Sequence, residues 1–355
     1  MMSGQAAPVC WLRLCVFVLL SGSSWCFRFS SRTTPRAGAS LLRAELMTMT
    51  SGESQIIRLV EKASGRGVVL IGTMHYNPAS ISLSQEVVSR LASQNQLSAV
   101  LVESCEARWN RTLKSQPQGT LLRSLLDNEM QAASESALAF NVPTLLGDQS
   151  INQTNARMKE TFRESLSDLT SLQFGRLLGD LDRARKVVLS PKMVDGSVRL
   201  LGPADLLSPS LVLGTPVSLV RYPLAIALKA PVFGALLVGS VAATLVGADS
   251  TPSVGAMMVS AGDWSLGDGA VWVERLVDVT QTLATVLLEV ALVGRTFLVC
   301  LLEERNVVLA DNIRRACSNA GAGQSVVAVL GAAHLNGIAA LLSNGFADEV
   351  EGGDG

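Results

Sequence analysis

The sequence has few aromatic residues and no excess of charge of either sign. Phe, Trp and Tyr make up 5% of its 355 residues, and 29 Lys plus Arg oppose 30 Asp plus Glu, for a formal net charge of -1. Without a basic excess the chain has no general attraction to a phosphate backbone, and few rings are available to stack on bases. We therefore expect no nucleic-acid partner.

Long polar or low-complexity tracts do not dominate the chain either. Hydrophobic residues form 48% of it and charged residues 17%, which is enough apolar material for one large domain or two ordinary ones. This composition excludes disorder, collagen and coiled coil as the main plan of the protein.

Cysteine is scarce and unevenly placed. Three of the six cysteines, Cys10, Cys15 and Cys26, lie near the N-terminus, and the other three, Cys105, Cys300 and Cys317, are scattered. An odd, dispersed set does not form a disulfide framework.

The first 44 residues contain five arginines but no lysine and no acidic residue. An apolar run from Val9 to Leu20 and the small residues after it are typical of a signal peptide. The Ser- and Arg-rich stretch that starts at Phe27 is typical of a transit peptide. We interpret residues 1–50 as a two-part leader that directs the protein to a plastid, with the secretory pathway or a membrane as the alternative.

After the leader, short apolar stretches alternate with helical patterns. We predict strands at 67–72, 97–103, 142–148 and 325–331, and helices at 82–94, 120–140 and 306–319. Short β-branched runs separated by helices predict an α/β fold with a mostly parallel sheet. The sheet is split into two sequence halves, 51–160 and 303–345. A helical, apolar insertion, 161–302, separates them, and 346–355 is an acidic, Gly-rich tail.

The insertion contains two apolar stretches. Residues 230–248 carry no charge, and 282–302 carry only Glu289 and Arg295. A bilayer is crossed by about 20 apolar residues, so membrane association through 206–302 as a two-helix hairpin is one interpretation. The other is a helical insertion buried within the protein. If residues on both sides of the insertion act together, the number of crossings between them must be even.

The chain has only two histidines. His75 and His334 both stand in a G-x-x-H pattern directly after a Val-rich predicted strand, and Glu103 and Asp148 follow two other strands. Ligands bind at the carboxyl ends of parallel strands, so we expect these four side chains to line one site. We expect the glycines before each histidine to let the chain leave its strand sharply.

Glu129 falls within the apolar stripe of the predicted helix 120–140, so its carboxylate points inward. A buried charge needs a cation, a metal or a hydrogen-bond partner, and Arg123 or Arg157 would provide an ion pair instead. Imidazoles and carboxylates together suit a divalent ion such as Mn, Co or Zn, which could activate water for hydrolysis.

These motifs, taken in order, resemble those of the TraB/PrgY family, which is related to the Tiki membrane proteases and more distantly to ChaN-like and erythromycin-esterase-like proteins. The matching segments are 71–75, 102–108, 129–133, 147–149 with Thr154 and Arg157, 304–306, and 329–334 with Gly337 and Ile338. The chain departs from the family pattern at Gln149, where the family has Arg, and at Asn306, where it often has Asp.

The resemblance implies a metal-dependent hydrolase, acting on a peptide bond, with a site built from both G-x-x-H motifs and the glutamates. It implies metal-ligating or catalytic roles for His75, His334 and Glu103, and a role as base or ligand for Glu129. It further implies that Arg157 and Arg305 hold the carboxylates, Asp148 among them, or a substrate carboxyl group. The alternative is a non-catalytic organelle or membrane protein that binds a peptide or metabolite in the same pocket.

Overall fold

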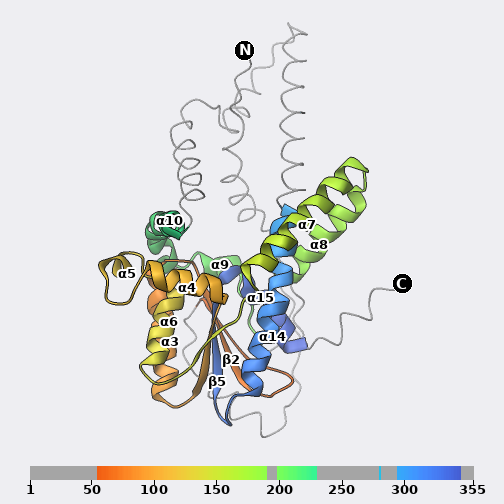
Figure 1. Ribbon diagram of the computed structural model, residues 1–355. Coiled ribbons are helices and arrows are strands. Elements are labelled where there is room, and N and C mark those ends of the chain that lie inside the picture. Colours follow the sequence, from red (N-terminus) through yellow and green to blue (C-terminus); the bar gives the residue numbers. More distant parts are fainter. Residues whose placement is uncertain (1–53, 190–197, 230–279, 281–293, 345–355) are drawn as a thin grey trace, which may run out of the picture.

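The computed structural model describes residues 54–189, 198–229, 280 and 294–344 (Figure 1). The leader, the uncharged run 230–248, most of the run 282–302 and the tail lie outside the described residues. The predictions of a plastid leader and of a membrane hairpin therefore stay predictions.

Five strands form one sheet in the order β1-β2-β5-β3-β4. All neighbours are parallel except β1, which runs antiparallel to β2 at the edge. The α/β fold with a mostly parallel sheet is thus confirmed, although the antiparallel edge strand is not among the predicted strands. The strands are β1 (Ile56–Val60), β2 (Gly67–Thr73), β3 (Leu97–Val102), β4 (Thr144–Leu146) and β5 (Ser325–Gly331).

The central position of β5 joins the two sequence halves. It comes from the end of the chain, yet it lies between β2 and β3, pairing Thr73 with Gly331 and Val102 with Val329. All residues of β2 are buried, and so are all residues of β5 except the last. Strands this apolar need cover on both faces, which is why they occupy the middle of the sheet.

Helices cover both faces of this sheet (Figure 1). On one face lie α3 and α6, and on the other lie α14 and α15. The helices are α3 (Pro78–Ser93), α4 (Glu106–Ser115), α5 (Leu121–Leu125), α6 (Glu129–Leu138), α7 (Ile151–Thr170), α8 (Phe174–Leu189), α9 (Pro203–Leu206), α10 (Pro209–Lys229), α14 (Glu304–Ser318) and α15 (Leu335–Asn344), with a π-helical turn η2 (Thr296–Glu303) before α14 and a 3-10 turn η3 (Ala332–His334) after β5.

The single helix predicted over 120–140 is wrong. Two helices, α5 and α6, occupy this segment, and Leu125, expected in the buried stripe, is 56% exposed. The physical reason is Asn128, whose side chain accepts a hydrogen bond from the backbone N–H of Gln131 and so begins a new helix. Glu129 becomes the first residue of α6.

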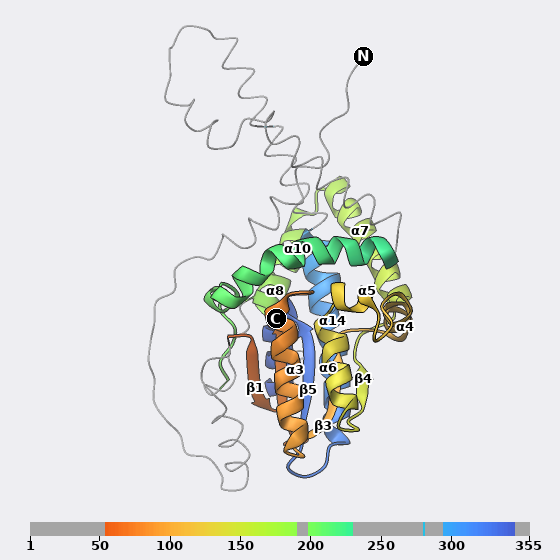
Figure 2. The ribbon, with the colours of Figure 1, turned by 90° about the vertical axis from the view of Figure 1, so that its left-hand side faces the viewer.

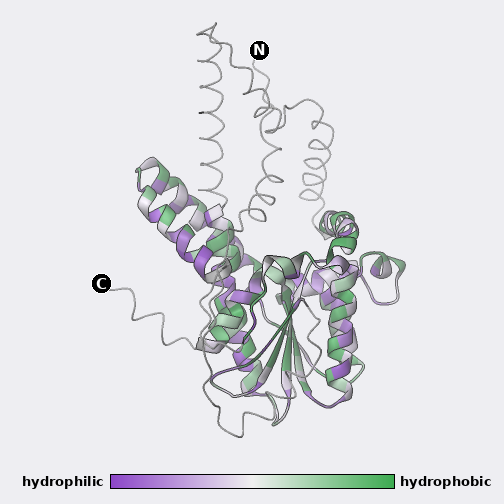
Figure 3. Ribbon diagram, turned by 180° about the vertical axis from the view of Figure 1, so that it is seen from behind, coloured by the Kyte–Doolittle hydropathy of each residue, from purple (hydrophilic) through white to green (hydrophobic). Residues whose placement is uncertain are grey.

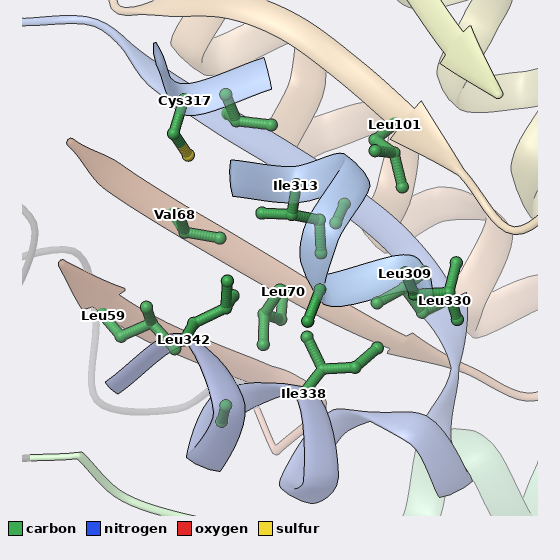
Figure 4. Packing of buried hydrophobic residues seen from close by; sticks show 14 of the residues in the cluster. Leu59, Val68, Leu70, Leu101, Leu309, Ile313, Cys317, Leu330, Ile338 and Leu342 are labelled. Carbon is green, nitrogen blue, oxygen red and sulfur yellow. The ribbon is translucent and has the colours of Figure 1, made fainter. Parts of the chain in front are cut away.

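The alternation of side chains along each strand divides the core into two clusters. In β2, Val68 and Leu70 face α14 and α15, whereas Val69 and Ile71 face α3 and α6. Figure 4 shows the first cluster, in which Ile313 and Leu309 of α14 lie over the strands. Burial of these apolar side chains on both faces supplies most of the driving force for folding.

The described part of the insertion lies beyond the carboxyl edge of the sheet. The α7–α8 hairpin projects away from it with hydrophilic and hydrophobic bands alternating along its length (Figure 3), and α10 crosses above α3 and α6 (Figure 2). Arg295, expected in an apolar run, is 2% exposed and binds Asp168 at 2.9 Å and also Asp180, which ties η2 to both helices of the hairpin.

Within the described residues, one helix is long and apolar enough to cross a membrane by length and composition. It spans Pro209–Leu228, and 22% of it is buried in the protein. This segment precedes the predicted run 230–248, and such a helix is weak evidence of a crossing on its own.

The core arrangement predicts a clear difference between two positions of α14. Ile313→Ala should lower the free energy of unfolding by about 2–5 kcal/mol, because Ile313 is fully buried and its loss leaves a cavity. The matched control Val307→Ala, which is 37% exposed on the same helix, should cost below about 1 kcal/mol. Urea unfolding measures both values, and equal losses would contradict the assignment of this helix face to the core.

Candidate functional site

The pairing of β2 with β5 brings the two histidines together. His75 lies two residues beyond Thr73 and His334 three residues beyond Gly331, and these two strand ends are register partners. A β-carbon added to Gly331 would lie 3.7 Å from His75 Nε2 and 3.7 Å from His334 Cδ2. These ring atoms are therefore at most twice that distance apart, although the residues are separated by most of the chain.

Glu129 is the partner of His75. Its Oε1 lies 2.6 Å from His75 Nδ1, and its Oε2 accepts a hydrogen bond from the Tyr76 backbone N–H at 3.1 Å. The Glu129 side chain is 1% exposed, so the inward aim expected from the sequence is found. The alternative ion pair with Arg123 or Arg157 is wrong, because Arg123 binds Asp127 and Glu135 instead.

The charge of Glu129 controls the protonation of His75. Burial by itself would lower the pKa of His75, but the negative charge of Glu129 and the hydrogen bond to it dominate and raise this pKa to about 9. Burial by itself would raise the pKa of Glu129, but the charge of His75 and the hydrogen bond to it outweigh this effect, so that the pKa lies below its ordinary value. The two form an ion pair at neutral pH.

His334 is held in the same way but by a neutral partner. Its Nδ1 lies 2.7 Å from Asn306 Oδ1, and its Nε2 lies 3.3 Å from Glu103 Oε1. His334 is 4% exposed and Asn306 is fully buried. Asn306 Nδ2 has no hydrogen-bond partner among the residues that the structure describes. Both imidazoles thus have Nδ1 bound to an outer oxygen and Nε2 directed toward the region around Glu103.

Glu103, which directly follows β3, links that strand to the end of β5. Its Oε2 accepts a hydrogen bond from the Gly331 backbone N–H at 2.6 Å, and its Oε1 lies 2.6 Å from Arg305 Nη2. Burial would raise the pKa of Glu103, but His334 and Arg305 outweigh this effect and hold the pKa far below its ordinary value. The carboxylate is therefore charged throughout the physiological range.

Asp148 and Arg305 complete the network, whereas Arg157 does not join it. Arg305 Nε donates to Asp148 Oδ1 at 3.1 Å, and Arg108 binds the same carboxylate from the other side. Arg157 instead binds Glu304 at 2.7 Å and further glutamates along α7. The structure thus brings together His75, His334, Glu103, Glu129, Asp148 and Arg305, and places Arg157 outside this group.

Tyr222 of α10 was not expected at the site. Its ring stacks on that of His75 with centroids 6.1 Å apart and an interplanar angle of 7°, and it also makes an edge contact with Tyr76. The chain has only two tyrosines, and both lie here. Tyrosine is as rare in this sequence as histidine, and this rarity could have identified Tyr222 as a candidate site residue.

The expectation that a β-carbon would be in the way at the glycines before each histidine is confirmed at Gly72, where it would lie 2.7 Å from Leu335 Cδ2. The described glycines with positive φ are Gly65, Gly119 and Gly323, so neither Gly72 nor Gly331 uses the left-handed conformation. Tyr76, at φ 61°, makes the turn after His75. A β-carbon at Gly331 would lie 3.2 Å from Glu103 Oε2, a tight contact that would require the carboxylate to shift.

The imidazole and carboxylate groups at the centre are of the types that bind a divalent metal, but their present spacing does not form a metal site. A metal-ligating histidine generally binds an outer oxygen through its second nitrogen, as both rings do here. Among the described residues, however, no group of three or more His, Cys, Asp or Glu side chains is arranged so that it could hold a metal ion. Both oxygens of Glu103 already accept hydrogen bonds, one from Arg305 and one from the Gly331 backbone N–H.

Comparison with known proteins adds no family assignment. No family model matches this chain, and no curated protein matches it. The resemblance to the TraB/PrgY family therefore depends on the motifs themselves and on where their residues lie.

The His75–Glu129 pair predicts a pH dependence of stability. Because the pKa of His75 is raised from 6.5 to about 9, the stabilisation is complete below pH 6.5 and is lost as the pH rises through about 9. We expect a loss of about 1 kcal/mol, reduced from the full linkage value because the side chain is about one-third exposed to screening solvent. Urea unfolding at pH 6 and pH 9.5, with EDTA present, should show this loss in the native chain and not in His75→Gln. Equal losses in both proteins would refute it.

The buried network predicts a large cost for removing its cation. Arg305→Met leaves the buried carboxylates of Glu103 and Asp148 without Arg305, and the free energy of unfolding should fall by about 3–5 kcal/mol. As a matched control, Arg315→Met breaks an exposed pair with Asp311 on the same helix and should change it by at most about 0.5 kcal/mol. Unfolding curves of the two variants that coincide would contradict a structural role for Arg305.

Proposed function

We propose that the protein is a metal-dependent hydrolase of the TraB/Tiki type that cleaves a peptide bond. The observation that carries the proposal is the convergence of both Nε2 atoms of the only two histidines on the buried carboxylate of Glu103. The motifs that resemble the family pattern contribute these same residues. Hydrolysis adds water across the amide, with the hydroxyl going to the carbonyl carbon and the proton to the leaving amine.

Each residue has a part in this proposal. His75 Nε2, His334 Nε2 and Glu103 would hold the ion, for which Mn, Co and Zn are the candidates. Binding would displace the Nε2 proton that His75 carries in its ion pair with Glu129. When bound, the ion supplies Lewis acidity and a more acidic water. Glu129 and Asn306 orient the two imidazoles through Nδ1, and Glu129 lies behind His75 rather than facing the centre. Arg305 would fix the orientation of Glu103 as a ligand.

The second candidate is a non-catalytic protein that binds a peptide or metabolite in the same place. The occupied oxygens of Glu103 favour this reading, because Arg305 and the Gly331 N–H satisfy the carboxylate without a metal. A ligand with a polar group would then meet His75, which is partly exposed, beside Tyr222.

The variant Gly331→Ala tests whether the two histidines and Glu103 form a metal-binding site or only a network of buried contacts. The added methyl would lie between the two imidazoles and within 3.2 Å of Glu103 Oε2. Calorimetric titration of the native chain with Zn or Mn should give about one bound ion per chain, and Gly331→Ala should weaken binding at least about tenfold, an effect of about 1.4 kcal/mol. The control Gly175→Ala, whose methyl meets no atom within 4 Å, should bind like the native chain. Less than about a tenth of an equivalent in the native chain would overturn the metal and favour the binding protein.

Catalysis is tested separately with a mixture of peptides and mass spectrometry of the products. Cleavage should require the added ion and should fall at least about 100-fold in His334→Ala, since a missing ligand or base generally costs this much. Cleavage that persists in His334→Ala would place the activity elsewhere or in a contaminant. Metal binding without cleavage of any peptide would leave the metal site but exclude peptide hydrolysis.

A further inference from the structure

One face of α10 points away from the protein and is apolar, and its role does not depend on the proposed function. The inward face of α10 is made of small or polar residues and one leucine, and these lie along its length: Leu211, Gly214, Ser218 and Ala225. Gly214 permits the close approach, because a β-carbon there would lie 2.3 Å from Asn77 Oδ1. Asn77 Nδ2 donates to the Leu211 carbonyl at 3.0 Å, which fixes the helix on the N-terminus of α3.

The outward face is the more hydrophobic one. A stripe at helical spacing is exposed along the helix, and Leu213 in it is 80% exposed. The stripe consists of Leu213, Val217, Val220, Leu224 and Leu228, and Val212 and Leu219 extend it on one side. A helix on the surface of a soluble protein turns its apolar stripe to the core, so α10 has the opposite pattern. A continuous apolar patch of this kind marks a surface that is covered by something other than water.

We propose that this face of α10 lies on a lipid bilayer with an anionic surface. Arg221, which follows Val220, is the only charged residue from 209 to 228, and the next is Lys229. From Leu207 to Ala248 the chain has no acidic residue, so nothing in this segment repels anionic headgroups. The chain continues from Lys229 directly into the uncharged run 230–248, whose sequence has the length and composition that a bilayer core accepts.

The helix lies along the bilayer and does not cross it. Its inward face contacts α3 and α4, and Leu211 at one end and Ala225 near the other are both 1% exposed because the protein covers them. A crossing helix could not keep the body of the protein against its whole length. The geometry is that of an interfacial helix, with the apolar stripe in the acyl boundary and Arg221 at the headgroups.

This placement has a consequence for the site. Tyr222 stacks on His75 from α10, and Met74 accepts a hydrogen bond at its sulfur from Thr215 of the same helix. The site is therefore separated from the lipid surface by about the width of one helix, roughly 10 Å.

Carbene footprinting of the full chain tests this proposal. A water-soluble diazirine reagent labels exposed side chains, and peptides are then quantified by mass spectrometry. On vesicles of phosphatidylcholine with phosphatidylserine, labelling of 209–228 should fall at least about threefold, as expected for a face inserted in the acyl boundary. Labelling at the C-terminal end of α6, where Leu138 is exposed at the end of that helix remote from Glu129, should not change.

Each other occupant of the face gives a distinct result that overturns the proposal. Low labelling of 209–228 without vesicles, at every protein concentration, would show that another segment of this chain covers it. Labelling that falls as the protein concentration rises would show a second copy. Unchanged labelling with vesicles would show that lipid does not cover it.

A pair of variants separates α10 from any other membrane-binding segment. With Leu213→Glu and Val220→Glu together, labelling of α10 should stay high on vesicles even where the chain still binds through another segment. Leu138→Glu with Phe140→Glu, which are also exposed but lie at and just beyond the far end of α6, should leave the protection of α10 intact. Protection of α10 that survives the first pair would refute the proposal. These measurements need no activity, so failure of the proposed hydrolysis would not affect them.

Discussion

The buried carboxylate of Glu103 is the interaction on which the rest of the site depends. It is charged, it is 7% exposed, and its charge is balanced by groups from distant parts of the chain: Arg305 of α14, the N–H of Gly331 at the end of β5, and His334. A buried charge without such partners would cost several kcal/mol, so the two sequence halves are held together by electrostatics at the same edge where apolar packing joins their strands. Asp148, bound by Arg305 and Arg108, extends this balance to the end of β4.

The two histidines have different environments, and this difference matters for any chemistry at the site. His75 faces a carboxylate on its outer side and is partly exposed, whereas His334 faces a neutral amide and is buried. The charged partner raises the pKa of His75, so one ring tends toward the cationic form. Asn306 stands where the family that the motifs resemble often has Asp. Its side chain is a neutral amide, so the group that binds His334 Nδ1 carries no charge. The departure therefore changes the electrostatics around His334 while preserving the contact that orients the ring.

The insertion does more than separate the halves. It contributes Tyr222 to the site and α10 to the surface above it, and its buried Arg295 connects η2, directly before α14, to the α7–α8 hairpin. Because α14 carries both Arg305 and Asn306, the helices of the insertion and the site share one rigid support. A lipid surface on α10 and a polar site beneath it would thus be neighbours through the same few helices.

The sequence by itself determined the α/β class, the parallel strands and the four strand-end side chains, because apolar runs and their punctuation are local signals. It also identified the inward aim of Glu129, since Ala133 and Ala137, which follow it at helical spacing, are apolar. The partners could not be obtained in this way. That Glu129 meets His75 rather than Arg123, that Arg157 belongs to Glu304, and that Tyr222 stacks on His75 depend on contacts between segments far apart in the chain. Only the insertion of β5 between β2 and β3 brings those segments to one edge, and such long-range pairing leaves no periodicity in the sequence.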